Sequence, residues 1–486
     1  MDRRNRGARR ERGRLRGPPA GYSVIPLHYR SLAEVSGEIA SGTLTAVEVT
    51  ATILDRITHL NPALGAFYTV FSDSASQEAK TADREIASGR HRGPLHGVPV
   101  ALKDLIELGP TTAGSGLMKD HQATTQGALV ERLREQGAVI VGKLATHEFG
   151  LSTQTFDDPF PPARNPWNTA LTPGGSSTGA GVALAAGLVF GAYGTDSGGS
   201  VRLPAANCSI VGFKPTFGMI GRSGIIPLSL SLDHVGPMAR TVADTLILLD
   251  AARGHDPRDP GSGRTQPQIS LEPQAIDGLV VGVPRGFWEP GCDAEVRSAI
   301  DRALEVLDRM GARIREVDLG VSLKQVVAVG YVVALTEAAA HHAHDIRGRA
   351  EQYGREFRLL MKIGMLIPGT AYLDAQRAHG AIARLVLAAF HECDVLVMPT
   401  LGALADPIPQ RAKRIDRRIS SSPAPAYTWL ANLYGGPAIS IPAGFSADGR
   451  PIGLQILGRP NDDAAVLRVA AAHERETSWS QQRPLP

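Results

Sequence analysis

TPGGSSTGAGVALAAGLVFGAYGTDSGGS occupies residues 172–200 and has the most unusual composition in the chain. Glycines and serines crowd both ends of this stretch, and a run of small residues between them, GAGVALAAG, favours a helix. Glycine lets the backbone adopt positive φ and approach a ligand closely. A glycine-rich turn that leads into a helix can also point several N–H groups at an anion. The stretch therefore predicts a functional site, for which three chemistries are open.

Phosphate binding is the first of these chemistries. A P-loop needs a lysine after its last glycine, and no lysine follows Gly179 or Gly181. A dinucleotide fingerprint needs a third glycine at the position where Leu184 stands. The stretch therefore disfavours a nucleotide, and we predict that the protein uses no cofactor.

The second chemistry is that of the nucleophile elbow of α/β-hydrolases. Residues 175–179, GSSTG, match the G-x-S-x-G pattern of this elbow, with Ser177 as the nucleophile. The elbow has to follow a buried strand, whereas RNPWNTALTP precedes it here, and Pro166 and Pro173 interrupt any strand. The sequence context therefore disfavours Ser177.

The third chemistry combines serines with a lysine that can lose its proton. Lys103 is a candidate for this role, because it ends the apolar, strand-like run VPVAL. The chain has only eight lysines among its 51 basic residues. Burial can make a lysine neutral near physiological pH, whereas an arginine keeps its charge. A lysine at the end of a strand is also commonly a solvated surface charge, so the position alone does not decide its role.

Helical and strand patterns alternate through most of the 486 residues. Thr45 is a candidate N-cap for a helix through TAVEVTATILDRI. GALVERLREQGAVIVGKL predicts a helix, a stop at Gly137 and a buried strand at residues 138–142. PAISIPAG and PIGLQILGR predict two paired strands around the turn SADGRP. This alternation predicts an α/β fold with a mixed, mostly parallel β-sheet covered by helices on both faces.

Composition and charge argue against several classes of protein. The chain is 43% hydrophobic and 20% charged, as globular proteins are, and its formal net charge of +3 gives no reason to expect a nucleic-acid or membrane partner. No apolar run reaches the roughly 18–20 residues that a membrane span needs. The three cysteines, Cys208, Cys292 and Cys393, lie far apart and fit neither a disulfide framework nor a thiolate metal site, which favours a cytoplasmic location.

Three segments are expected to lie outside the regular elements. The first sixteen residues carry eight arginines, and we expect residues 1–20 to form a disordered N-terminal extension. Residues 256–275 and 407–425 are rich in proline and serine and are expected to be long loops. The first of these loops could link two domains or cross between two halves of one core.

At these positions the sequence resembles the amidase signature family. The blocks that carry the resemblance follow one another in order: PLHGVPVALKD (94–104), TTAGS (111–115), GAVIVGKLATHEF (137–149), NPW (165–167), PGGSS (173–177), GTDSGGSVRLPAANCSIVGFKPT (194–216), SLDHVGPMARTVAD (231–244), and then PAISIPAGF and GLQILGRP. The GGSS and GTDxGGSxRxPA blocks at this spacing are highly specific to the family. The resemblance implies one compact α/β domain, residues 21–486, in which residues 256–275 form a surface loop.

The resemblance also implies roles for single residues. Lys103 matches the family's base, Ser176 its bridging serine, which family members hold through a cis peptide bond, and Ser200 its nucleophile. The positions that match the oxyanion hole are the backbone N–H groups of Ser197, Gly198, Gly199 and Ser200. Gly150 matches a position that lines the acyl pocket in some relatives and is a candidate substrate-binding residue. The resemblance implies neither a metal nor a cofactor.

The reaction implied by the resemblance is cleavage of a linear amide, or of a carbamate or ester, through an acyl-enzyme on Ser200. Neutral Lys103 would accept a proton from Ser176 while Ser176 takes one from Ser200, because a serine hydroxyl is a poor nucleophile until its proton is removed. The expected partner is therefore a small-molecule amide, carbamate or ester, with no nucleic acid and no membrane. A homodimer is an open option for the assembly.

Three positions depart from the family pattern. Thr178 and Ser197 differ from the residues common there, but neither change removes a proton-transfer group. Leu203 matters more, because the amidotransferase that converts glutamyl-tRNA to glutaminyl-tRNA usually has a polar Gln at this position. The apolar Leu203 indicates a substrate other than glutamine. An A-type subunit of that amidotransferase, which releases ammonia from glutamine, is the alternative function.

The run AAAHHAHD is a candidate metal site. It places His341 and His344 on one helical face, with Glu337 and Asp345 each four residues from His341. The simpler interpretation is an exposed or partly buried helix face without a metal, and we predict no metal.

Side chains around the predicted nucleophile also have two interpretations. Asp196 and Arg202 flank Ser200 and could contact substrate, but we expect an ion pair that fixes the nucleophile loop. Three aromatic residues near the end of the chain could line an apolar pocket or belong to the core: Tyr427, Trp429 and Tyr434.

Overall fold

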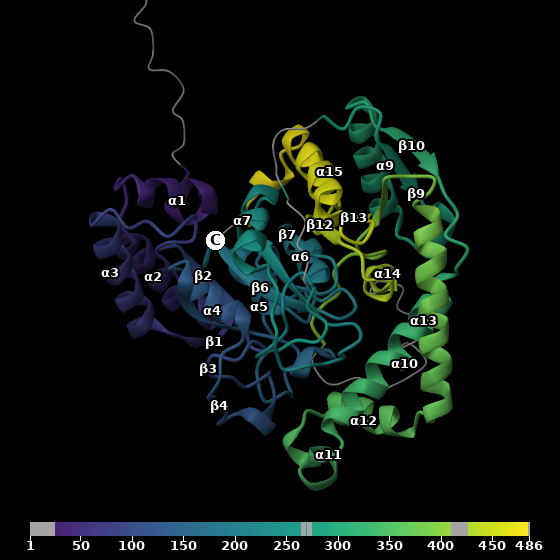
Figure 1. The fold of residues 1–486 in the computed structure, drawn as a ribbon, viewed down its shortest axis with the longest axis horizontal. Coiled ribbons are helices and arrows are strands. Elements are labelled where there is room, and N and C mark those ends of the chain that lie inside the picture. The colour runs from purple at the N-terminus through teal and green to yellow at the C-terminus, as the bar shows by residue number, and fades with distance from the viewer. Residues whose placement is uncertain (1–24, 264–268, 270–274, 410–425, 485–486) are drawn as a thin grey trace, which may run out of the picture.

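The computed structural model describes residues 25–263, 269, 275–409 and 426–484. Its core is one eleven-stranded sheet in the order β1-β5-β2-β6-β8-β7-β12-β13-β11-β9-β10, beside a separate pair of short strands, β3 and β4 (Figure 1). The strands are β1 (Phe67–Val70), β2 (Pro99–Lys103), β3 (Gly109–Pro110), β4 (Gln122–Ala123), β5 (Val139–Leu144), β6 (Gly191–Asp196), β7 (Val211–Lys214), β8 (His234–Ala239), β9 (Val280–Val283), β10 (Arg313–Glu316), β11 (Val395–Pro399), β12 (Ala438–Phe445) and β13 (Pro451–Gly458). The predicted α/β fold with a mixed sheet is confirmed.

Helices connect and cover these strands. The α-helices are α1 (Leu32–Ala40), α2 (Ala46–Leu64), α3 (Ser72–Ala87), α4 (Ala128–Glu135), α5 (Thr178–Ala185), α6 (Arg202–Cys208), α7 (Val242–Ala252), α8 (Arg285–Trp288), α9 (Ala294–Arg309), α10 (Leu323–His342), α11 (Asp345–Gly348), α12 (Arg355–Leu366), α13 (Gly369–Ala389), α14 (Ala426–Tyr434) and α15 (Asp463–Glu476). Short 3-10 turns, among them η3 (Glu148–Gly150), lie between them.

The strand directions differ from the predicted, mostly parallel sheet. Of the ten neighbouring pairs in the large sheet, four are parallel, β5 with β2, β2 with β6, β11 with β9 and β9 with β10, and six are antiparallel. The prediction of a mostly parallel sheet was therefore wrong. All five neighbouring pairs in the central run β6-β8-β7-β12-β13-β11 are antiparallel. The sequence did not predict this, because a succession of helices and strands does not specify which strands become neighbours.

Helices cover both faces of the sheet, as predicted. On β6, the side-chain direction of Gly191 points at Leu248 of α7, whereas that of Gly194 points at Ser177 and Val201 beside α5 and α6. Positions an odd number of residues apart in a strand face opposite sides of the sheet. On β13, Gly453 faces α6 and Gly458 faces α15 in the same way. Helices α5 and α6 thus lie on one face, and α7 and α15 on the other.

Local sequence signals explain several elements. Thr45 caps α2, and its hydroxyl and backbone form a reciprocal capping box with Glu48. Helix α4 ends shortly before Gly137, which has φ of 71°, and the buried strand β5 follows, in agreement with the predicted unit. The predicted hairpin near the C-terminus is present as β12 and β13.

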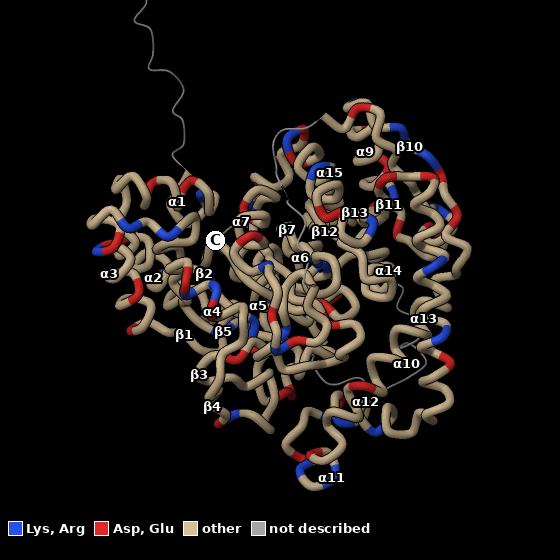
Figure 2. The backbone as a smooth tube through the Cα atoms, in the orientation of Figure 1, with Lys and Arg blue, Asp and Glu red and all other residues tan. Residues whose placement is uncertain are grey.

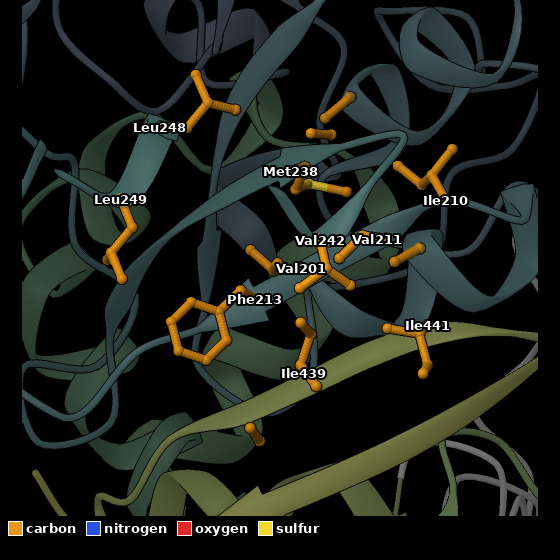
Figure 3. Close-up of a cluster of buried hydrophobic side chains, with 14 of the residues drawn as sticks. Val201, Ile210, Val211, Phe213, Met238, Val242, Leu248, Leu249, Ile439 and Ile441 are labelled. Atoms are coloured by element: carbon orange, nitrogen blue, oxygen red, sulfur yellow. The ribbon is translucent and has the colours of Figure 1, made fainter. Parts of the chain in front are cut away.

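Apolar side chains from residues 201–238 pack against the C-terminal hairpin in the core of the sheet (Figure 3). Figure 3 shows Val201, Phe213, Met238 and Ile439 packed together, and all four side chains are fully buried. Phe213 and Ile439 are register partners across β7 and β12. The C-terminal hairpin is therefore part of the same core as β7 and β8, the strands that follow the predicted nucleophile.

A group of helices, α10, α12, α13 and α14, packs together at one side of the molecule (Figure 1). Within the described residues α10 is long and apolar enough to cross a membrane by length and composition alone. Its apolar residues have partners in the fold, because α10 packs against α12, α13 and α14. Helices α10 and α12 and the loops near the predicted site share a second hydrophobic cluster that includes Leu105, Phe149, Leu228 and Phe357.

Basic and acidic residues are interspersed over the described chain (Figure 2). The predicted extension, residues 1–20, lies outside the described residues, as do parts of both predicted loops. Where the first loop is described, it is tied to the core, because Asp259 is buried and pairs with Arg222 at 2.9 Å.

Candidate active site

Lys103 is the last residue of β2, an inner strand of the large sheet. Its side chain is fully buried, and its Nζ donates to Ser176 Oγ and to Thr195 Oγ1, each at 2.7 Å. Burial lowers the pKa of Lys103 to about 7, although the carboxylates of Asp196 and Asp233 oppose this shift. A large fraction of Lys103 is therefore an uncharged amine near neutral pH, with a lone pair that can accept a proton.

Ser176 lies in the turn before α5 and is buried. The Gly175–Ser176 peptide bond is cis, as the resemblance implied. The Ser176 carbonyl accepts a hydrogen bond from the His147 N–H at 3.1 Å. A Cβ on Gly175 would lie 2.2 Å from His147 Cε1, so only glycine fits against this ring. Burial lowers the pKa of His147 to about 4, and the ring is neutral at pH 7.

Ser177, the serine of the elbow pattern, is not placed as a nucleophile. Its side chain is fully buried, and its Oγ donates to the Thr195 carbonyl at 3.3 Å. No strand leads into it, since β5 ends at Leu144 and the next strand, β6, begins at Gly191. The Ser177 N–H donates to the Ser200 carbonyl at 3.1 Å and thereby ties the two serine-bearing turns together.

Ser200 lies between β6 and α6 and is half-buried. Among the residues that the structure describes, none forms a hydrogen bond with its hydroxyl. The hydroxyl is therefore free to rotate toward a neighbouring acceptor or a bound carbonyl. The structure brings the turns of Ser176 and Ser200 together above the end of β2, where Lys103 lies.

Asp196 and Arg202 form the predicted ion pair beneath the Ser200 turn. Both side chains are fully buried, and Arg202 donates to both carboxylate oxygens of Asp196, from Nη2 at 2.8 Å and from Nε at 3.0 Å. Burial alone would raise the pKa of Asp196, but Arg202 outweighs it and holds that pKa well below its usual range. Three further groups accept hydrogen bonds from Arg202: the Thr428 carbonyl, Gln455 Oε1 and Asn432 Oδ1. The ion pair fixes the turn, and its hydrogen-bonding groups already have partners within the protein.

The predicted oxyanion turn needs one correction. The Gly199 N–H donates to Asp196 Oδ1 at 2.8 Å and is therefore already committed to a carboxylate. This leaves the N–H groups of Ser197, Gly198 and Ser200 as the candidate donors. Gly199 instead shapes the turn, because it has φ of 127°, and a Cβ there would lie 2.2 Å from Thr428 Oγ1.

Gly150, the candidate substrate-binding residue, lies beside Ser176. A Cβ on Gly150 would lie 3.6 Å from Ser176 Oγ, 3.2 Å from Leu105 Cδ1 and 4.0 Å from Leu228 Cβ. The turn that contains Gly150 is held by Glu148, which accepts from the Ser115 hydroxyl at 2.6 Å and from the Gly354 N–H at 3.0 Å. A substrate group beside Ser176 at this point would thus meet backbone and two leucines.

Comparisons with known proteins show the family of the chain. The family model described as Amidase matches residues 48–467. The chain belongs to the amidase family. This family consists of hydrolases that act on carbon–nitrogen bonds.

Relatives and solved structures of amidases match over nearly the full length. The A-type subunit of glutamyl-tRNA(Gln) amidotransferase from Chloroflexus aurantiacus is 37% identical over 488 residues, which cover 95% of this chain and 99% of that protein. A crystal structure of an amidase is 30% identical, has a TM-score of 0.81 and covers 92% of this chain and 100% of its own. A bacterial aryl acylamidase of the amidase signature family is 27% identical, has a TM-score of 0.85 and covers 95% of this chain and 100% of its own.

The other candidates of the sequence have structural roles in this amidase. Glu337 already accepts hydrogen bonds from the hydroxyls of Ser229 and Tyr372, at 2.7 and 2.9 Å. Among the described residues there is also no group of three potential metal ligands. The candidate metal site at His341 and His344 is therefore not supported. The three aromatic residues near the end of the chain are all buried: Tyr427, Trp429 and Tyr434.

Two sets of hydrogen bonds that support the site were not predicted from the sequence. Thr195, in the GTDSGGS block, accepts the second hydrogen bond of Lys103, and its place in that block could have indicated it. Thr428 and Asn432 of α14 bond to the turn of Ser200, and no local pattern indicates this because they lie about 230 residues away.

Proposed function

We propose that this chain is a serine hydrolase that cleaves linear amides through an acyl-enzyme on Ser200. The observation that carries the proposal is the 2.7 Å hydrogen bond between the buried Lys103 Nζ and Ser176 Oγ. A serine nucleophile needs a base, and a lysine with a pKa of about 7 can serve as one near neutral pH. Ser176 is bonded to that lysine and its neighbour Ser177 is bonded to the Ser200 carbonyl, which supports a role for Ser176 in passing a proton between Lys103 and Ser200.

In the first half of the reaction, Ser200 Oγ attacks the carbonyl carbon of the substrate. Ser176 accepts the proton of Ser200 and gives its own proton to the lone pair of neutral Lys103, while Thr195 Oγ1 keeps the amine oriented. The C–N bond then breaks as Ser176 returns a proton to the leaving nitrogen and regains one from Lys103. The products of this half are a free amine and the Ser200 ester.

In the second half, a water molecule resolves the ester. Ser176 takes a proton from water as the water oxygen attacks the acyl carbon, and Ser200 regains its hydroxyl proton as the acid leaves. In both halves the carbonyl oxygen becomes an oxyanion beside the Ser197–Ser200 turn. Loss of one donor at such a position typically costs about 2.7–4 kcal/mol of barrier stabilisation.

The surroundings of the two serines favour an uncharged acyl group. Leu105 and Leu228 lie on the Gly150 side, and Leu203 packs beside Gly199, where a Cβ would lie 3.1 Å from Leu203 Cγ. None of these leucines offers a hydrogen bond, and burying a charged substrate group without one is unfavourable. Carbamates and esters present the same carbonyl centre and are included in the proposed range.

A second candidate is an A-type subunit of glutamyl-tRNA(Gln) amidotransferase, which would release ammonia from glutamine. Its support is the 37% identity with the Chloroflexus aurantiacus protein over 95% of this chain. Leu203 favours the first candidate, because it is apolar next to the nucleophile turn. An amidotransferase component would also need partner proteins, which a free amidase would not.

The test is to assay the purified chain alone on arylamides, aliphatic amides, carbamates, esters and glutamine, with Ser200→Ala and Lys103→Ala as controls. We expect turnover of at least one simple amide, lost in both variants. If glutamine is the only substrate that is hydrolysed, and only after partner proteins are added, the second candidate is favoured. Full activity in Ser200→Ala would rule out the proposed mechanism.

A further inference from the structure

Helix α14 lies directly behind the turn of Ser200. Thr428 Oγ1 donates to the Gly198 carbonyl at 2.5 Å, and Asn432 Nδ2 donates to the Asp196 carbonyl at 2.9 Å. The ring of Trp429 packs on Gly198, where a Cβ would lie 2.7 Å from ring carbons. All three α14 side chains are buried. One helix thus contacts both the start and the middle of the turn.

The Gly198–Gly199 peptide is held at both of its ends. Its carbonyl accepts from Thr428, and its N–H donates to Asp196 Oδ1 at 2.8 Å. A peptide unit is planar, so these two bonds together fix its rotation. Glycine restricts the backbone less than any other residue, and two consecutive glycines would otherwise let the turn adopt many orientations.

We propose that Thr428 is a positioning residue for the oxyanion hole of this amidase. By anchoring the Gly198 carbonyl, its hydroxyl fixes the direction of the neighbouring N–H groups of Gly198 and Ser200 before substrate binds. Preorganised donors stabilise a developing oxyanion because they need no reorientation during the reaction. This role rests on the proposed function, since it assumes that Ser200 is the nucleophile.

The helix supplies a rigid support for this role. The Thr428 carbonyl accepts from Arg202 Nη1 at 2.9 Å, and Asn432 Oδ1 accepts from Arg202 Nη2 at 2.7 Å. Arg202 in turn holds Asp196. The hydroxyl of Thr428 is therefore attached to the same network that fixes the far end of the Gly198–Gly199 peptide.

The test compares Thr428→Val, which keeps the shape and loses the hydroxyl, with Thr428→Ser, which keeps the hydroxyl and loses the methyl group. Because removal of a direct oxyanion donor lowers kcat by about 10²–10³, we expect loss of its anchor to lower kcat by about tenfold or more, with KM little changed. Thr428→Ser should recover most of this loss. Affinity for a trifluoromethyl ketone that forms an oxyanion should fall with kcat, whereas affinity for an unreactive amide should not.

Thr400→Val is the matched control, because Thr400 is also buried and its hydroxyl bonds to Ser440, on β12, at 2.7 Å rather than to the turn. It should lose stability without a change in ketone affinity. If Thr428→Val does not fold, Thr428→Ser against Thr428→Cys gives the same comparison, since a thiol is a weak donor. Equal kcat and ketone affinity in the variants with and without the hydroxyl would overturn the proposal.

Labelling of Ser200 by a fluorophosphonate separates this inference from the function on which it rests. No labelling of the wild-type chain at Ser200 would refute the proposed nucleophile itself. Labelling that is lost in Ser200→Ala, but proceeds at the wild-type rate in Thr428→Val, would refute only the role of Thr428. We expect labelling in Thr428→Val that is slower by about the factor seen in kcat.

Discussion

Three lysines are fully buried in the described part of the chain, Lys103, Lys143 and Lys214, and burial lowers the pKa of each. Their partners differ. Lys143 lies 2.9 Å from an oxygen of Asp104, whereas Lys214 donates to backbone carbonyls. Only Lys103 donates to two hydroxyls, one of them on Ser176. A low pKa is therefore common to all three, and the hydrogen bond to Ser176 is what favours Lys103 as the proposed base.

The pH dependence of the reaction should follow Lys103. Because the base has to be neutral, kcat/KM should rise about tenfold per pH unit below about pH 7 and level off above it. A pH–rate profile of the wild-type chain measures this limb. Lys103→Arg retains the charge and cannot supply a neutral amine, so it should be inactive across the range. A profile that falls as the pH rises through 7 would contradict the assignment.

Ser177 offers a sharp comparison with its neighbour Ser176. Ser177→Ala removes only a hydrogen bond to the Thr195 carbonyl, so we expect near wild-type kcat and a loss of about 1 kcal/mol in unfolding free energy. Ser176→Ala breaks the proton relay and should lower kcat by several orders of magnitude. Steady-state kinetics and urea denaturation of both variants test this. An inactive Ser177→Ala variant would instead support Ser177 as the nucleophile of an elbow.

At the scale of elements, the sequence predicted the caps, stops and turns that depend on residues close together in the chain. The cap at Thr45, the stop at Gly137 and the hairpin of β12 and β13 each follow from local backbone chemistry. The proposed proton-relay residues were predicted from the ordered motifs of the family resemblance, and the structure brings Lys103 and Ser176 into hydrogen-bond contact. Strand directions were not predictable, because a succession of helices and strands does not specify which strands become neighbours. The contribution of α14 was missed for the same reason.

The Asp196–Arg202 pair joins the consecutive elements β6 and α6, and Arg202 also bonds to α14 and β13, which are distant in the chain. Removing one partner leaves a buried charge, and we expect Arg202→Met or Asp196→Asn to cost about 3–5 kcal/mol of unfolding free energy. Urea denaturation measures this loss. The double variant should lose less than the sum of the single losses, because it leaves no unpaired charge. Additive losses would show that the two side chains act independently.

At the scale of the whole molecule, the sheet order joins the chain into one unit. The C-terminal strands β12 and β13 lie between β7 and β11, so the earlier and the middle segments meet only through them in the large sheet. The site likewise draws on β2, the turn of Ser200 and α14. Local loss of any of these segments would break it.

We therefore expect activity and helical content to be lost together on urea denaturation. Both signals, amide turnover and far-UV circular dichroism, should show one coincident transition, because the site and the sheet share the same strands. Activity that disappears well before helical content would show that the site unfolds as a separate unit.

The large sequence separation between Arg202 and its partners has a consequence for folding during translation. Its partners Thr428, Asn432 and Gln455 are synthesised 226 to 253 residues later. At bacterial-to-eukaryotic translation speeds, the nascent chain waits on the order of ten to fifty seconds before these groups emerge. During that interval the arginine lacks the groups that later enclose it. A growing polypeptide thus contains Ser200, the proposed nucleophile, long before the groups that support its turn are made, and a prematurely terminated translation product should be inert.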